Sequence, residues 1–372
     1  SDIASVIQNG LKPKFVDINL NNLSMNEESV INLINKNTKV NLFAPNISIS
    51  KQKLKNIYNI KNNINYISTF NKQKNLNFYE RVIFSFKVFN QKNYKISKNN
   101  EKNLYLSRSV VFAVLACLLN KKIILELHHE LAGLTKFMFF LLKKMGFLDN
   151  LKYIFIHKNL VKIFKPLKSC YICLDDAVNI NDFKKFKSKY KAKTCIYVGS
   201  FHKGKGIEKI LELAKKLKDI NFHLYGDKRF LDEKINIKNL KVFDHIPYKK
   251  IPNVLSNYNV ALMPYENRVM GRLKNINLVN FMSPLKMFDY LASSKIILAS
   301  DLKVYSHILK HNYNSILIKD RIDEWVFWIN RIFNTKKNFK HLQDNARRTA
   351  MRFTWQKRSK KILNFAKKKS LI

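Results

Sequence analysis

A glycine-rich turn at residues 199–206 is the part of the chain whose residue types best suit phosphate chemistry. Gly199, Gly204 and Gly206 are three of only eight glycines among 372 residues, and Lys205 lies between the last two. The apolar run CIYV ends just before the turn, and a helix-period run begins directly after it. A glycine turn between a strand and a helix presents free backbone N–H groups and the positive helix end to a phosphate. The sequence therefore predicts a phosphate-binding turn here.

A second candidate lies in the segment FMSPLKMFDYLASS. Ser283 and Pro284 suit the cap and the first position of a helix, whose free N–H groups and dipole would hold a diphosphate. Asp289 follows less than two turns later and can accept hydrogen bonds from sugar hydroxyls. The alternative is an ordinary amphipathic helix with Leu285 and Phe288 in the core. Because both motifs are expected at the carboxyl edge of one parallel sheet, ligand binding is the preferred interpretation.

The elements that would position these motifs alternate along the chain. Short apolar strands and amphipathic helices follow one another over residues 103–157 and again over 194–320, as in parallel βαβ units. The polar, lysine-rich stretch Asn181–Lys193 separates the two series. We predict an α/β fold with two doubly wound, Rossmann-like domains facing across a cleft. The predicted divisions are 39–190, 191–345, and a C-terminal helix, 346–372, that returns to the first domain.

The net charge of +43 comes from 69 Lys and Arg against 26 Asp and Glu. A lysine-rich composition, an anionic membrane surface or nucleic acid could each explain it. Lysine is spread over the whole length, and arginine, which reads base edges best, is scarce, so nucleic acid is not the expected partner. The apolar segment 134–148, with Lys143 and Lys144, is either a buried helix with one solvent-exposed edge or an interfacial helix on anionic lipid.

The cysteine pattern indicates neither a disulfide framework nor a zinc site. Cys117, Cys170, Cys173 and Cys195 each lie in an apolar run. The Cys170–Cys173 pair has no second pair and no histidine at ligand spacing, so we expect two thiols along a strand and no metal. The first residues lack the apolar core of a signal peptide, and we expect a reducing, cytoplasmic setting.

Several motifs in order carry a family resemblance. The second half contains YVGSFHKGKGIEKILELAKKL, FDHIPYKKIPNVLSNYNVALMPY, SPLKMFDYLASSKIILASDL and the terminal NARRTAMRFTWQKRSKKIL. This half resembles the donor domain of a GT-B glycosyltransferase of the large retaining family four. LYLSRS and ILELHHE in the first half resemble the acceptor domain of that family. The resemblance covers about residues 39–368.

The resemblance implies a nucleotide-sugar donor. Lys205 would grip the donor diphosphate, and Asp289 matches the second glutamate of the E-x7-E motif, which holds the ribose. The first glutamate falls at Phe281, and Ser200 stands where the family often has arginine. His128 matches a histidine that faces the transferred sugar; alternatively it is a hydrogen-bonded histidine at a strand end. The implied donor-binding residues are Gly199, Ser200, Lys205, Gly226, Ile246, Ser283, Pro284, Leu285, Lys286 and Asp289.

Residues 1–38 resemble an internal fragment of the sugar aminotransferases that use pyridoxal phosphate. The fragment lacks the cofactor lysine and is too short to bury a core alone, so we expect no aminotransferase activity. The expected function is therefore retaining transfer of a sugar from a nucleotide-sugar to a saccharide or lipid-linked acceptor, in surface polysaccharide or glycolipid synthesis. We expect neither a metal nor pyridoxal phosphate, and a cytoplasmic protein peripheral to the inner membrane face. The alternatives are a catalytically impaired homologue and a basic nucleic-acid-binding protein.

Overall fold

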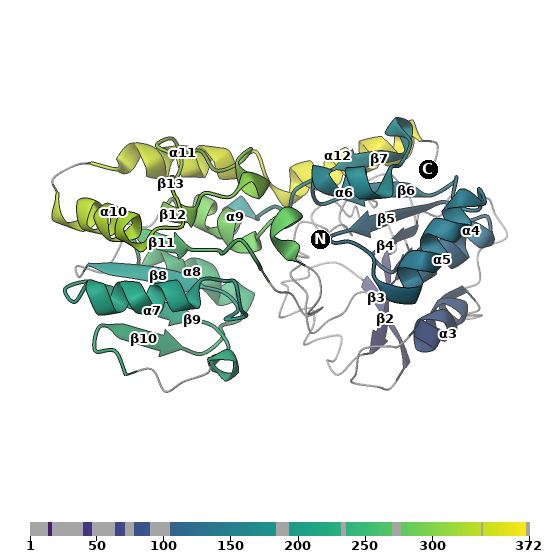
Figure 1. The fold of residues 1–372 in the computed structure, drawn as a ribbon. Helices are drawn as coiled ribbons and strands as arrows, with labels where there is room; N and C mark the ends of the chain where they lie inside the picture. The colour runs from purple at the N-terminus through teal and green to yellow at the C-terminus, as the bar shows by residue number, and fades with distance from the viewer. Residues whose placement is uncertain are drawn as a thin grey trace. The chain divides into compact units, whose positions relative to one another are not determined.

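The chain folds into two compact α/β units, drawn in the computed structural model of Figure 1. The first unit comprises residues 1–175 and 355–372, and the second comprises residues 176–354. In the described residues, no helix is long and apolar enough to cross a membrane. The structure describes residues 14–16, 40–46, 64–70, 78–89, 105–183, 193–231, 236–269, 277–335 and 338–369.

The first unit is built on a seven-stranded sheet in the order β3-β2-β1-β4-β5-β6-β7. All of its strand pairs are parallel, as the alternation of strands and helices predicted. Ser109 begins one of its helices in the expected way, since its side chain accepts a hydrogen bond from the Phe112 N–H. The elements are β1 (Lys14–Val16), β2 (Val40–Asn46), β3 (Ile64–Phe70), α3 (Phe78–Phe89), β4 (Tyr105–Ser107), α4 (Val110–Leu118), β5 (Ile123–Leu127), α5 (Gly133–Lys144), β6 (Lys152–Phe155), α6 (Lys158–Phe164), β7 (Tyr171–Cys173) and α12 (Trp355–Lys368).

The position of β1 corrects the predicted start of this domain. Its backbone pairs with two strands at once, because Val16 lies opposite Phe43 of β2 and Ser107 of β4. A doubly wound sheet needs a central strand at the point where the strand order reverses, and β1 occupies that place. The sheet of the first unit therefore includes Lys14–Val16, which lie before the predicted start at residue 39.

The second unit is built on a six-stranded parallel sheet in the order β10-β9-β8-β11-β12-β13. Both faces of this sheet are covered. Ile196 and Val198 of β8 belong to one buried cluster, and the alternate residues Cys195 and Tyr197 belong to the other. The elements are β8 (Thr194–Val198), α7 (Ile207–Lys216), β9 (Asn221–Tyr225), β10 (Leu240–Phe243), α8 (Ile251–Ser256), β11 (Val260–Met263), α9 (Leu285–Ala292), β12 (Ile296–Ser300), β13 (Ile316–Ile318), α10 (Ile322–Asn334) and α11 (Lys340–Ala350).

The division between the units falls at 175/176 rather than at the predicted 190/191. Val178 and Phe183 are buried in a core cluster of the second unit. Arg347 of α11 fixes this segment further by donating hydrogen bonds to the carbonyl groups of Ile180 and Phe183. The polar stretch Asn181–Lys193 suggested a linker, but its first residues, as far as Phe183, are already packed on the second unit.

The return to the first unit also differs from the prediction. Residues 346–350 belong to α11, whose Ala346 and Ala350 are fully buried in the second unit. The chain leaves that unit after Thr354, and the helix of the first unit is α12. The sequence placed the change too early because α11 and α12 have a similar helical pattern and only a short break between them.

Candidate functional site

The glycine turn lies at the carboxyl end of β8, where it opens α7. Gly206 caps this helix in the left-handed region, with φ of +78°, and Gly204 has φ of +84°. A Cβ on Gly204 would collide with the carbonyl oxygen of Arg268, and one on Gly206 with that of Pro264. Both positions therefore require glycine, because neither the backbone conformation nor the space admits a side chain. The segment after β11 thus packs directly on the turn.

Lys286, in the first turn of α9, points its ammonium at this glycine turn. Its Nζ lies 3.5 Å from the centre of the Tyr197 ring, and a Cβ on Gly199 would come within 2.6 Å of it. The Nζ is buried and has no hydrogen-bond partner among the described residues. The space that Gly199 leaves empty is therefore what admits this cation.

Lys205 supplies a second cation to the same place. Its Nζ lies 4.9 Å from the centre of the Tyr265 ring, and Lys286 Nζ lies 5.3 Å from the same centre. Burial lowers the pKa of Lys205 to about 8. Burial, followed by repulsion from Lys205, lowers the pKa of Lys286 well below its ordinary value, although Asp289 opposes this shift. The two ammonium groups lie near the same aromatic ring and form no salt bridge with a described residue. A bound anion would therefore strongly stabilise their charged forms.

Asp289 lies further along α9 and is 5 % exposed. Burial raises the pKa of its carboxyl to about 7, and Asp182 raises it further, while the Tyr248 hydroxyl and Lys286 lower it. The Tyr248 hydroxyl donates a hydrogen bond to Asp289 Oδ1 at 3.0 Å. Tyr248 was not predicted from the sequence. Its position two residues after Ile246, one of the predicted donor-binding residues, was the signal that could have indicated it.

Two tyrosines fix the cations and the carboxylate relative to the sheet. The N–H of Val198, the last residue of β8, donates to the Tyr290 hydroxyl of α9 at 2.9 Å. The Tyr197 hydroxyl donates to the Ser200 carbonyl at 2.8 Å and holds the start of the glycine turn. As a result, α9 and the turn are attached to the same strand end. A ligand could contact both without a rearrangement of the sheet.

The beginning of α9 differs from the predicted one. The helix starts at Leu285, and Pro284 is its N-cap, without a side-chain cap. The Ser283 hydroxyl accepts a hydrogen bond from the Asp176 N–H at 3.0 Å instead of capping the helix. Ser283 therefore secures the first residues of the unit beside the site. The backbone N–H groups of the first turn of α9 still belong to a helix N-terminus that bears Lys286.

The other predicted donor-site residues surround this centre at the ends of the strands. Gly226 follows β9 and packs against Gly199, whose carbonyl oxygen a Cβ on Gly226 would strike. Ile246 is half-buried in the segment after β10. Phe281 occupies the position of the missing glutamate and is 4 % exposed, and its apolar ring cannot make the polar contact of a glutamate. Ser200 is exposed and offers a hydroxyl where an arginine was expected.

His128 belongs to the first unit, where it follows the carboxyl end of β5. Its Nε2 forms a hydrogen bond with Oε1 of Glu126, a carboxylate that is buried beside it. Glu126 and His128 lie on the same side because side chains two residues apart along a strand point to one face. Arg358 of α12 lies 3.5 Å from the same carboxylate. Burial, followed by the nearby charge of Arg108, lowers the pKa of His128 well below its ordinary value, which favours the neutral imidazole.

The described ranges contain no group of three or more His, Cys, Asp or Glu placed to hold a metal ion. Cys170 and Cys173 are free thiols, Cys170 buried and Cys173 exposed at the end of β7. The prediction that both thiols lie along a strand is confirmed for Cys173, which belongs to β7. Cys170 lies instead in the short 3-10 helix before that strand.

The sequence of the second unit matches the family model of glycosyl transferases group 1 over residues 178–349. This segment is therefore similar to the domain of the glycosyl transferases group 1. No curated protein gave a sequence match to the chain. The family match begins inside the packed segment that follows the division at 175/176, in agreement with the unit boundary.

Solved structures of glycosyltransferases share the fold over almost the whole chain. A glycosyltransferase from Rickettsia africae matches with a TM-score of 0.73 and 14 % identity, covering 97 % of this chain and 99 % of its own. HepE from Anabaena in complex with UDP and glucose matches with a TM-score of 0.67 and 13 % identity, covering 96 % and 99 %. Sucrose-phosphate synthase from Thermosynechococcus elongatus matches with a TM-score of 0.66 and 12 % identity, covering 96 % and 98 %. The chain has the GT-B fold of these glycosyltransferases.

Proposed function

We propose that this chain transfers a sugar from a nucleotide-sugar donor to a saccharide or lipid-linked acceptor. The observation that carries the proposal is the pair of ammonium groups near the Tyr265 ring, the buried Nζ of Lys286 and the Nζ of the half-buried Lys205, at the glycine turn and the N-terminus of α9. Neither makes a salt bridge with a described carboxylate, and their charges match the two negative charges of a diphosphate. Asp289, lower on α9, would accept hydrogen bonds from the ribose hydroxyls.

Uridine diphosphate is the nucleotide we propose for the donor. HepE of Anabaena was solved with UDP and with UDP-glucose, and it shares the fold of this chain. The segment with Ile246 and Tyr248, after β10, would lie along the uracil and the ribose, because Tyr248 already contacts Asp289. Bound ribose would compete with the Tyr248 hydroxyl for this carboxylate.

We infer a retaining reaction of the family-four type, without a metal ion or pyridoxal phosphate. As the bond between the anomeric carbon and the phosphate oxygen breaks, negative charge develops on the diphosphate. Lys205, Lys286 and the helix N-terminus of α9 would stabilise that charge, which is the electrostatic role a metal plays elsewhere. The acceptor hydroxyl would attack from the side of the leaving phosphate, which can take its proton. Neutral His128 would hydrogen-bond the transferred sugar.

We propose that the enzyme works at the inner face of an anionic membrane, in surface polysaccharide or glycolipid synthesis. In α5, only Phe139 is buried, and one side of the helix is apolar and exposed. Exposed lysines, Lys136 and Lys144, accompany this side. An apolar helix face flanked by lysines suits the interface of a membrane with anionic lipids. The exposed apolar residues are Leu134, Phe137, Met138, Leu141 and Met145.

Nucleotide-sugar turnover tests the enzymatic proposal. The purified protein is incubated with UDP-, GDP- and ADP-sugars, and nucleotide release is measured with and without candidate acceptors. We expect release of UDP from one UDP-sugar and its reduction in Lys205→Met and Asp289→Asn. An impaired homologue would bind UDP without releasing it from any donor, and a protein that binds none of these nucleotides would contradict the proposal.

Flotation with lipid vesicles tests the membrane part separately. We expect the protein to float with vesicles that contain anionic phospholipid and not with vesicles of phosphatidylcholine alone. Exchange of Phe137 and Leu141 for glutamate should abolish flotation, while the same exchange at Phe86 of α3, another exposed aromatic residue, should not. Equal flotation of both variants would contradict this assignment of the surface.

A further inference from the structure

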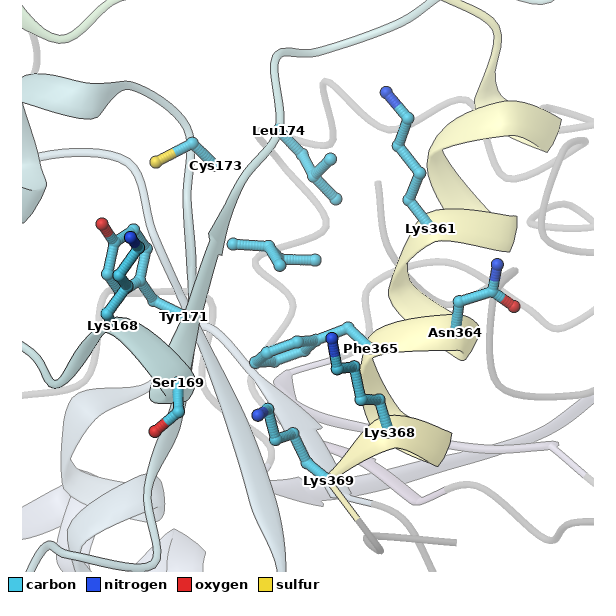
Figure 2. Close-up of a pocket in the computed structure, with 11 residues that line it drawn as sticks. Lys168, Ser169, Tyr171, Cys173, Leu174, Lys361, Asn364, Phe365, Lys368 and Lys369 are labelled. Atoms are coloured by element: carbon cyan, nitrogen blue, oxygen red, sulfur yellow. The ribbon is translucent and has the colours of Figure 1, made fainter.

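A groove of about 760 Å³ lies in the first unit between β7 and one side of α12 (Figure 2). The helix residues that line it recur at the spacing of a single helix face. Lining residues from the strand side include four consecutive positions of the chain, 171–174, so the groove follows the strand along its length. The lining residues are Lys168, Ser169, Tyr171, Ile172, Cys173, Leu174, Lys361, Asn364, Phe365, Lys368 and Lys369.

β7 presents a backbone edge to this groove. It is the last strand of the sheet, and among the described strands it pairs only with β6. The Leu174 N–H donates to the Phe155 carbonyl of β6 at 2.9 Å. Because backbone groups of a strand alternate between its two sides, the N–H and C=O groups of Tyr171 and Cys173 point to the open edge. Such an edge is a template for another extended chain.

The groove combines an apolar floor with a positive rim. Phe365 and Leu174 are buried, and in Figure 2 Phe365 extends toward β7. Lys168, Lys361 and Lys368 are exposed around them. Of the described residues that line the groove, none is acidic. Lysine is common throughout this chain, but the lack of any acidic counterpart along this groove leaves a local excess of positive charge.

One end of the groove lies away from His128 within the first unit. Lys168 precedes β7, and Lys368 and Lys369 are at the end of α12, so these three lysines mark the amino end of the strand. His128 follows the opposite, carboxyl end of the parallel strand β5. An occupant held by these three lysines would therefore lie at the end of the sheet opposite to His128.

We propose that this groove binds an extended acidic segment of a partner protein, which adds a strand to the open edge of β7. The backbone of the segment would pair with Tyr171 and Cys173. Its acidic side chains would meet the lysines of the rim, and its alternate apolar side chains would lie on Phe365 and Ile172. A phospholipid would satisfy the lysines but would leave the strand edge unpaired. The site therefore suits an acidic peptide better than a lipid, and it adds a protein partner to the transfer activity.

Fluorescence polarisation with the full-length chain tests the proposal. The probe is a labelled, end-capped octapeptide of alternating Glu and Val. Two further peptides carry N-methyl groups either on every Glu or on every Val, so that each blocks the amides on one side of the strand. We expect one of these two to lose at least about tenfold in affinity and the other to bind as the parent does. Equal affinities of the two methylated peptides, or failure of the parent to bind, would overturn the proposal.

Charge variants test where the peptide binds. Lys368→Glu should weaken binding of the parent peptide about tenfold, and Lys361→Glu should weaken it as well. Lys367→Glu is the matched control, because Lys367 is an exposed neighbour on α12 that does not line the groove. Circular dichroism establishes that each variant is folded. An equal loss in Lys367→Glu would show that net charge alone attracts the peptide, and displacement of the peptide by vesicles of anionic phospholipid would favour a lipid site; either result would overturn the proposal.

Discussion

The Lys286 ammonium lies 3.5 Å from the centre of the Tyr197 ring, in space that the absent side chain of Gly199 leaves free. The aromatic ring offsets part of the cost of burying this charge, but a ring face cannot replace the hydrogen bonds of water. The unliganded protein therefore keeps a cation under unfavourable conditions at the end of β8. The buried ammonium therefore lowers the free energy of unfolding of the unliganded protein, and a bound diphosphate would remove this destabilisation.

Exchange of Lys286 for methionine should make the unliganded protein more stable. Methionine keeps most of the side-chain volume and removes the buried charge, and such replacements raise the free energy of unfolding by up to about 4 kcal/mol. Urea unfolding at pH 7 measures the difference. Lys303→Met, at an exposed position of the same unit, is the control and should change little. A less stable Lys286→Met variant would show that the ammonium already has good partners.

The stability of the unliganded protein should rise with pH between 8 and 10, in part through Lys205. Its folded pKa is about 8, below the ordinary lysine value of about 10.4. In this window the unfolded chain binds a proton that the folded chain has released, so raising the pH favours folding. One such proton contributes at most about 1.4 kcal/mol per pH unit.

Thermal unfolding of wild type and Lys205→Met across this window measures the contribution of Lys205 together with its effect on the pKa of Lys286. Lys295, whose pKa burial also lowers to about 8, contributes to both proteins and cancels in the difference. The wild type should gain more stability with pH than the variant does. Identical slopes in the two proteins would contradict the lowered pKa of Lys205.

Removal of the Tyr248 hydroxyl should shift the pH dependence of nucleotide binding upward. That hydroxyl lowers the pKa of Asp289, which lies at about 7, so Tyr248→Phe should raise the pKa further. Fewer Asp289 side chains would then be ionised at pH 7, and the ionised form accepts ribose hydroxyls better. UDP affinity measured from pH 5 to 9 should reach its half-maximum at a higher pH in Tyr248→Phe. In Asp289→Asn this pH dependence should be absent. If the midpoint pH of UDP binding is unchanged in Tyr248→Phe, the effect of the Tyr248 hydrogen bond on Asp289 is contradicted.

Loss of Arg358 should destabilise the first unit. Arg358 is 4 % exposed, lies 3.5 Å from the buried Glu126 carboxylate and donates through Nε to the Asp175 carbonyl at 2.9 Å. Arg358→Met leaves that carboxylate without its cation, at a cost of about 3–5 kcal/mol. Urea unfolding should show this loss, and Glu126→Gln combined with Arg358→Met should recover part of it. No recovery in the double variant would mean that the two residues act independently.

Local sequence patterns were sufficient to predict most of the fold. The elements from Tyr105 to Phe155 and the strands around the glycine turn follow from alternating apolar runs, and the parallel sheets follow from that alternation. The central position of β1 in the sheet could not be predicted, because the local pattern of its three residues, KFV, does not show which strands it pairs with. Its place depends on pairing with β2 and β4, which are distant in sequence.

The candidate site was predictable where the backbone itself demands a residue type. Gly204 and Gly206 stand where no side chain fits, and Lys205 lies between them. The sequence did not reveal Tyr248, or that Ser283 would bind the Asp176 N–H instead of capping α9. Both contacts join segments far apart along the chain, and a local pattern contains no information on such pairs.

Calorimetric titration with UDP and with uridine tests the central claim, that a nucleotide diphosphate lies on Lys205 and Lys286. The proposal predicts that the wild type binds UDP at least about tenfold more tightly than uridine, and that Lys286→Met removes most of this difference. Lys303→Met should bind both as the wild type does. Equal affinities of the wild type for UDP and uridine, or an unchanged preference in Lys286→Met, would contradict the claim.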